Sequence, residues 1–238
     1  MLRYIDTSPP SKKRKLFTLI RKSVNKFFNS IGLPFELNQK ADNSAMITLE
    51  QVVNLQHLVD QVIYFNVPGE LIELGTYKGK SAMHIQSVIV KRSSNKKLHV
   101  YDQFNKGYDK GKHIKETLLE NFKNAELPPP IIHEGFFIET LPSQLPDKIC
   151  FVHIDCGYGG NPETHKKTIL FCLEKVYPLL SVGAVCLLMD YHDYKKTIKG
   201  INSNPGVKMA CDEFLSDKKE KVDVLYGNDF SHGFFRKL

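Results

Sequence analysis

The chain has 238 residues, of which 42% are hydrophobic and 25% are charged, a composition typical of a globular protein. No apolar run approaches the roughly 20 residues needed to cross a bilayer, and no apolar signal-peptide core follows the charged N-terminus. We therefore expect a cytoplasmic protein. The net charge of +7 is equivalent to the excess of Lys and Arg between Asp6 and Glu36. Because the rest of the chain is nearly balanced, we expect no nucleic-acid partner.

The basic segment, residues 11–30, is predicted to form an amphipathic helix with lysines on one face. Two interpretations stay open. The helix packs on the domain or on another subunit, which would favour a homo-oligomer, or it makes a weak contact with a membrane surface or anionic polymer. A second helix is predicted over residues 48–65. We expect residues 1–65 to form an N-terminal helical cap and residues 66–238 to form the main domain.

The main domain begins with a buried strand, a glycine turn and a helix. Leu71 to Leu74 form the predicted strand, Gly75 and Gly79 bracket the turn, and the helix starts at Lys80. A turn of this kind directs backbone N–H groups and a helix N-terminus at a ligand above the strand ends.

The later elements continue this alternation of strands and helices. Strands are expected at residues 98–101, 131–134, 149–154, 184–189, 222–226 and 233–235, with helices at 112–124, 162–176 and 209–215. A turn is expected after Glu134 and another over residues 177–183. The pattern predicts an α/β, Rossmann-like fold with a mainly parallel seven-stranded sheet and helices on both faces.

Acidic residues stand at five of the strand ends, where ligands of such sheets bind. They are Glu73, Asp102, Glu134, Asp155 and Asp190. The turn reads G-x-x-x-G rather than the G-x-G-x-x-G of dinucleotide-binding proteins, and a carboxylate just before it would repel phosphates. S-adenosylmethionine, which has an amino group, a sulfonium and a ribose but no phosphate, suits this edge better than NAD does.

The sequence also resembles the macrocin O-methyltransferase family of class I S-adenosylmethionine-dependent methyltransferases. The resemblance covers about residues 46–238 and lies in the order and spacing of its motifs. These motifs are Val67-Pro-Gly-Glu-Leu-Ile-Glu-Leu-Gly-Thr-Tyr-Lys-Gly-Lys-Ser-Ala, Val100-Tyr-Asp-Gln-Phe, Glu134-Gly-Phe-Phe-Ile-Glu-Thr-Leu-Pro, Val152-His-Ile-Asp-Cys and the late helix from Pro205.

The resemblance implies a role for each matching position. The methionine end of the cofactor would be held by Glu73, Gly75, Thr76, Tyr77, Gly79 and Ser81. Asp102 would bind the ribose, with Gln103 and Phe104 beside it. Gly135 and Phe136 would border the adenine, and Asp155 would lie beneath the transferable methyl group.

The resemblance further implies a Mg²⁺ site made by three carboxylates. Asp155 and Asp190 match two of them, but Met189 stands at the third position, and a thioether is a poor ligand for Mg²⁺. The loop after Asp155 also reads Cys-Gly-Tyr-Gly-Gly, where the family has a second Asp and then a bulky residue. Two alternatives stay open: Mg²⁺ on Asp155 and Asp190, to which Asp193 or His192 could add a ligand, or no metal, with Asp155 or His192 as the catalytic base.

The function that we expect is S-adenosylmethionine-dependent O-methylation of a sugar hydroxyl on a small-molecule acceptor. The alternative is a non-catalytic or metal-independent protein on a methyltransferase fold, with a different small-molecule acceptor. An NAD-dependent oxidoreductase is disfavoured because the third glycine of the dinucleotide motif is absent.

Overall fold

The computed structural model describes residues 23–28, 30–32, 47–104, 113–157, 160–193, 204–227 and 230–238, and the chain divides into two compact units, Met1–Thr48 and Leu49–Leu238. In the first unit, residues 23–28 and residue 30 are helical. The remainder of the helix predicted over residues 11–30 lies outside the described residues. Within the described parts of the chain, no helix is long and apolar enough to span a membrane.

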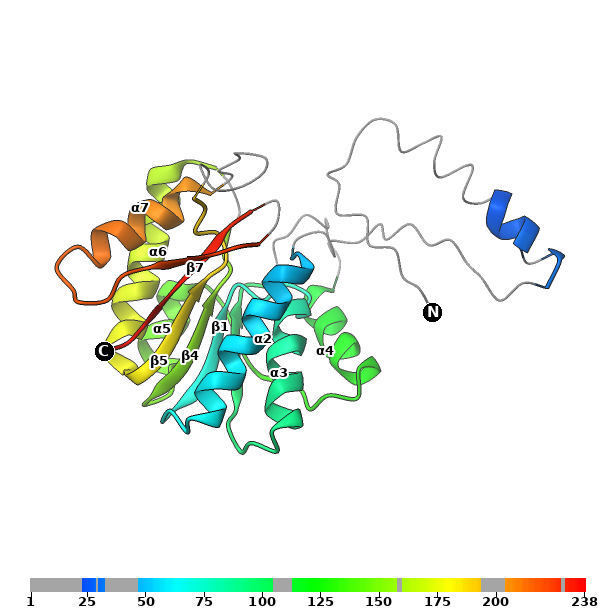
Figure 1. The fold of residues 1–238 in the computed structure, drawn as a ribbon, viewed down its shortest axis with the longest axis horizontal. Helices are drawn as coiled ribbons and strands as arrows, with labels where there is room; N and C mark the ends of the chain where they lie inside the picture. The colour runs from blue at the N-terminus through cyan, green and yellow to red at the C-terminus, as the bar shows by residue number, and fades with distance from the viewer. Residues whose placement is uncertain are drawn as a thin grey trace. The chain divides into compact units, whose positions relative to one another are not determined.

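A seven-stranded sheet with the strand order β3-β2-β1-β4-β5-β7-β6 forms the core of the second unit (Figure 1). The strands are β1 (Glu70–Leu74), β2 (Leu98–Asp102), β3 (Ile131–Glu134), β4 (Ile149–Ile154), β5 (Leu180–Leu188), β6 (Asp223–Leu225) and β7 (His232–Arg236). Strands β1 to β5 are parallel, and β7 runs antiparallel between β5 and β6. The predicted α/β fold with a mainly parallel seven-stranded sheet is confirmed.

Helices cover both faces of this sheet (Figure 1). One layer contains α2 (Leu49–Tyr64), α3 (Lys80–Lys91) and α4 (Ile114–Asn124), and the other contains α5 (Phe137–Gln144), α6 (Pro162–Val176) and α7 (Pro205–Phe214). All six residues of β4 are buried, as expected for a central strand covered on both faces. Helix α2 packs on α3 and β5, so it belongs to the second unit, whereas the sequence placed residues 49–65 with the N-terminal cap.

The prediction of a turn over residues 177–183 is wrong for residues 180–183, which belong to β5. Only Tyr177–Leu179 form a short 3-10 helix, and β5 starts directly afterwards. Gly183 has a φ of +86° and lies where the register between β4 and β5 shifts, yet its N–H donates to the carbonyl of Lys237 at 2.8 Å. A glycine within a bulged strand therefore looked like a turn in the sequence.

Helix α5 occupies the position where a turn was predicted after Glu134. The internal Pro142 hides this helix in the sequence, because proline removes a helical hydrogen bond. The side chain of Glu139 accepts a hydrogen bond from the N–H of Phe136 at 3.0 Å and stabilises the first turn. Helix α7 begins at Pro205, where the family resemblance placed the late helix, and four residues before the start expected from the local pattern.

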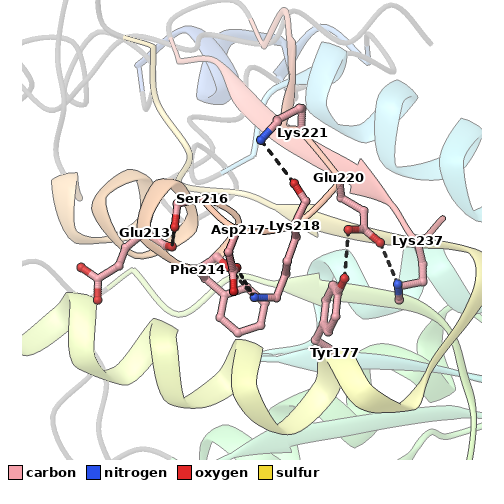
Figure 2. Close-up of polar contacts among 9 residues, drawn as sticks. All are labelled: Tyr177, Glu213, Phe214, Ser216, Asp217, Lys218, Glu220, Lys221 and Lys237. Atoms are coloured by element: carbon pink, nitrogen blue, oxygen red, sulfur yellow. Dashed lines mark hydrogen bonds and ion pairs between the residues drawn. The ribbon is translucent and has the colours of Figure 1, made fainter.

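A polar cluster fastens the C-terminus to the start of β5 (Figure 2). The carboxylate of Glu220, which is 3% exposed, accepts hydrogen bonds from Tyr177 Oη at 2.9 Å, Lys237 Nζ at 2.7 Å and the N–H of Leu238 at 3.1 Å. Lys237 Nζ also lies 4.6 Å from the centroid of the Tyr177 ring. These contacts anchor the last residues beyond the edge of β7.

Candidate active site

The carboxyl ends of the parallel strands lie side by side, and this arrangement brings the predicted site residues to one edge of the sheet. Backbone hydrogen bonds continue the ladder past the strands. They run from Gly75 N–H to Tyr101 O, from Asp155 N–H to Leu74 O, from Gly135 N–H to Asp102 O and from Met189 N–H to Ile154 O, at 2.9 to 3.0 Å. The site is therefore built on rigid backbone.

The turn between β1 and α3 requires both of its glycines. Gly75 has a φ of +88°, and a Cβ atom there would lie 2.2 Å from the carbonyl oxygen of Asp155. Gly79 has a φ of +78°, and a Cβ there would lie 2.9 Å from Leu118 Cγ. Residues with side chains adopt such φ values at a cost, so the turn can approach β4 and α4 closely only with glycine.

Asp102 joins the end of β2 to this turn. Its Oδ2 accepts a hydrogen bond from the N–H of Tyr77 at 2.8 Å, and its Oδ1 accepts one from the N–H of Phe104 at 2.9 Å. Both donors have left-handed backbones, with φ of 49° and 52°. Because a carboxylate oxygen can accept more than one hydrogen bond, Asp102 retains capacity for the ribose hydroxyls predicted for it.

Glu73 forms a fully buried pair with His153. The two residues face each other across β1 and β4, and Nδ1 of His153 lies 2.7 Å from Oε1 of Glu73. Burial alone would lower the pKa of His153, but the hydrogen bond to Glu73 and the charges of Asp155 and Asp190 raise it overall. His153 is therefore a packed, hydrogen-bonded histidine, and Glu73 is its partner.

Buried acceptor atoms without a hydrogen-bond partner lie in the predicted cofactor set. Among the described residues, Oε2 of Glu73, Oγ1 of Thr76 and Oε1 of Gln103 are buried and have no partner. Buried polar groups in folded proteins are nearly always paired, so these three atoms indicate a ligand. They fit S-adenosylmethionine, which offers an amino group and ribose hydroxyls as donors and a sulfonium as a cation.

The other predicted cofactor residues lie on the same elements. Ser81 is buried in the first turn of α3. Gly135 directly follows β3 with a φ of +144°, and the neighbouring Phe136 is 44% exposed. An exposed aromatic ring at this position is suited to stacking on a base, and its contact with adenine stays a prediction.

Asp155 follows β4 at the centre of this edge. Burial raises its pKa to about 7; the charge of His153 opposes this effect, whereas the charges of Asp190, Glu73 and Asp102 add to it. A carboxylate with a pKa near 7 can accept a proton at neutral pH and is more basic than an ordinary aspartate.

His192, the other candidate base, is only 3% exposed. Its Nδ1 lies 2.7 Å from the carbonyl oxygen of Ser231, so this nitrogen carries a proton and donates it. Its Nε2 lies 3.6 Å from Oδ1 of Asp190. His192 is therefore less accessible than the half-buried Asp155.

The residues present do not fit Mg²⁺. Met189 is 3% exposed and offers a thioether where an oxygen ligand would be required. In the described parts of the chain, no three His, Cys, Asp or Glu side chains form a group that could hold a metal ion. We therefore derive no catalytic step through a metal at Asp155 and Asp190.

Two residues at this edge were missed in the sequence. Asn204 donates a hydrogen bond from Nδ2 to Oδ1 of Asp190 at 3.0 Å. A Cβ atom on Gly157 would lie 2.0 Å from Oδ2 of Asp190 and 2.4 Å from Nδ2 of Asn204. No local pattern indicates these contacts, because they join segments that only the fold brings together.

Two solved structures with the same architecture are O-methyltransferases. The O-methyltransferase NovP matches with a TM-score of 0.63 and 20% identity, over 79% of this chain and 80% of NovP. CalS11, a TDP-rhamnose 3'-O-methyltransferase of calicheamicin biosynthesis, matches with a TM-score of 0.57 and 16% identity, over 96% of both chains. These similarities show that the fold is that of a class I methyltransferase.

The family model described as Macrocin-O-methyltransferase (TylF) matches residues 38–208. The chain belongs to this family, as the sequence motifs indicated. A demethyldecarbamoylnovobiocin O-methyltransferase from Streptomyces niveus is 25% identical over 173 residues, which are 63% of this chain and 63% of that protein. A tetracenomycin rhamnosyl 4'-O-methyltransferase from Streptomyces olivaceus is 25% identical over 181 residues, or 63% of this chain and 67% of that protein.

Proposed function

We propose that this protein transfers a methyl group from S-adenosylmethionine to a hydroxyl of a sugar or sugar-containing small molecule. The observation that carries the proposal is the set of buried, unpartnered acceptor atoms of Glu73, Thr76 and Gln103 beside the β1 turn. A pyrophosphate would meet repulsion there, whereas a cationic cofactor with donor groups would satisfy these atoms. Family membership supports the same cofactor.

The protein residues would hold the cofactor and align the acceptor. Glu73 and Thr76, with the turn from Gly75 to Gly79, would hold the methionine end, and Asp102 would hold the ribose. When bound, S-adenosylmethionine supplies a methyl group on a cationic sulfur; as the new O–C bond forms, the S–C bond breaks and its electron pair returns to sulfur. Orientation of the hydroxyl by the rigid strand ends would lower the barrier further.

The hydroxyl proton must leave as the oxygen attacks, and we assign its acceptance to Asp155. Its pKa of about 7 and its half-buried position support this role. The products would be a methyl ether, S-adenosylhomocysteine and a protonated Asp155. His192, which is nearly buried and hydrogen-bonded to Ser231, would then orient its neighbours rather than accept the proton.

The sugar acceptor is supported by the relatives. The match from Streptomyces olivaceus acts on a rhamnosyl group according to its name, and CalS11 is a TDP-rhamnose 3'-O-methyltransferase. A non-catalytic protein on the same fold is the second candidate, and the buried Met189 at an expected ligand position favours it. A homo-oligomer, a cytoplasmic location and a surface contact through residues 11–30 stay predictions.

Calorimetry and a transfer assay test the proposal. S-adenosylmethionine and S-adenosylhomocysteine should bind with about one site per chain, and NAD should not bind. Labelled methyl groups should then appear on at least one member of a panel of TDP-sugars and glycosides. Asp155→Asn should abolish transfer, whereas Asp217→Asn, an equivalent change at an exposed surface position, should not. Binding without transfer on any panel member would favour the non-catalytic candidate, and NAD binding would refute the cofactor assignment.

A further inference from the structure

One oxygen of the Asp190 carboxylate, Oδ1, has two protein neighbours, Asn204 and His192. Its Oδ1 accepts the hydrogen bond from Asn204 Nδ2 at 3.0 Å and lies 3.6 Å from Nε2 of His192. His192 is itself fixed by its hydrogen bond to the carbonyl of Ser231. The residues after β5 thereby contact Asn204 at the start of α7 and Ser231, which directly precedes β7.

Asn204 is placed to cap α7 but does not. It occupies the N-cap position of this helix, where an asparagine side chain normally accepts a hydrogen bond from the first turn, yet no such bond is present. Its amide instead donates to Asp190. The side chain has therefore been diverted from its usual helix-capping role to the site.

Gly157 leaves the space that this contact occupies. A Cβ atom there would overlap both Asp190 Oδ2, at 2.0 Å, and Asn204 Nδ2, at 2.4 Å. The φ of Gly157 lies outside the left-handed region, so an L side chain would meet a steric obstacle rather than backbone strain. Gly157, Asp190 and Asn204 therefore pack as a unit.

From this geometry we infer that Asp190 is a positioning carboxylate, braced by the hydrogen bond from Asn204, and that the site works without a divalent cation. The inference concerns the same site as the proposed function and rests on that function, because the site is catalytic only if methyl transfer takes place there. A cation on Asp155 and Asp190 would find methionine, Met189, at the position of the third carboxylate and an amide N–H from Asn204 already directed at Oδ1 of Asp190, and neither group is a ligand for Mg²⁺.

Metal binding can be measured without knowing the acceptor. The full chain, stripped with EDTA and saturated with S-adenosylhomocysteine, is titrated with Mn²⁺ while the free ion is followed by electron paramagnetic resonance. We expect no saturable binding of Mn²⁺ up to roughly 1 mM, the range of the weak calcium sites of extracellular modules. The Asp155→Asn variant should give the same titration curve as the wild type. One Mn²⁺ per chain, lost in Asp155→Asn, would overturn the inference. If S-adenosylhomocysteine does not bind, the same titration without it still tests the inference. The absence of S-adenosylhomocysteine binding would refute only the proposed function.

The brace itself is tested by matched variants. Asn204→Ala should lower the melting temperature by about 4 °C, the effect of losing one hydrogen bond to a charged group in a protein of this size. Asp190→Asn keeps an acceptor oxygen for Asn204, so its melting temperature should fall by less than half as much. Asp190→Ala removes the acceptor, so its melting temperature should fall at least as far as that of Asn204→Ala. If Asn204→Ala leaves the melting temperature within 1 °C of wild type, or if Asp190→Asn and Asp190→Ala are equal, the brace is refuted. In any active transfer assay, EDTA should change the rate less than about twofold.

Discussion

Replacing Glu220 with glutamine should destabilise the protein in a manner that depends on pH. The desolvation of this carboxylate alone would raise its pKa. The hydrogen bonds from Lys237, the backbone and Tyr177 outweigh that effect and lower the pKa from 4.5 to about 2. Glu220→Gln keeps the shape of the side chain and removes the charge, so it isolates the contribution of the ionised form (Figure 2).

The magnitude follows from the pKa. At about 1.4 kcal/mol for each pH unit, the difference between 4.5 and about 2 corresponds to about 3 kcal/mol at pH 7. Because the pKa is lowered in the folded state, this stabilisation is present above pH 4.5 and is lost as the pH falls towards 2. About half of it should remain at pH 3. The Glu220 side chain is 3% exposed, but its partner Lys237 is 21% exposed, so solvent screening makes this value an upper limit.

Urea unfolding of wild type and Glu220→Gln at pH 7, 4 and 3 measures this directly. We expect the difference in the free energy of unfolding to fall from about 3 kcal/mol to about half that value at pH 3. Glu213→Gln is the control, since Glu213 is 57% exposed in its ion pair with Lys166 and should contribute less than about 1 kcal/mol. A difference for Glu220→Gln that is constant across pH would refute the reasoning.

Three further predictions concern the site. Asp155→Asn should reduce methyl transfer by about 10²-fold or more while the affinity for S-adenosylhomocysteine in calorimetry changes little; an unchanged rate would exclude Asp155 as the base. Since the base must be deprotonated, the rate for wild type should rise with pH through about 7, and a rate flat from pH 6 to 8 would contradict this. Gly75→Ala should prevent cofactor binding, because its Cβ would lie 2.2 Å from the Asp155 carbonyl oxygen; binding with wild-type affinity would disprove the close approach.

Elements with a buried apolar pattern and clear ends could be predicted from the sequence. The strand β4 and the helix α6 have the predicted bounds, because a mainly apolar run ends in a carboxylate and a proline marks the first helical turn. Helix α5 and the first half of β5 could not be predicted, because Pro142 and Gly183 are ordinarily breakers. In β5 the hydrogen bond from Gly183 to Lys237 overrules the local preference, and in α5 the side chain of Glu139 stabilises the first turn ahead of Pro142.

The edge of the sheet that carries the predicted cofactor residues could also be predicted, because the carboxyl ends of parallel strands lie at one side of a sheet. The contacts between side chains at this edge could not be predicted. The pair of Glu73 with His153 depends on the register of β1 and β4, which the two sequence segments do not encode separately. The contact of Asp190 with Asn204 joins the end of β5 to the N-cap of α7, which only the folded chain brings together.

The five carboxylates at the strand ends now differ in a way that the sequence did not indicate. Four have a partner that holds the charge: Glu73 with His153, Asp102 with two backbone N–H groups, Glu134 with Lys115, and Asp190 with Asn204. Within the described residues, the side chain of Asp155 has no hydrogen bond, and its neighbours act on it only through burial and charge. A carboxylate that must exchange a proton in every cycle has to keep its oxygens available, whereas the other four are fixed by their hydrogen-bond partners. This division is why we expect Asp155, rather than His192, to take the acceptor proton.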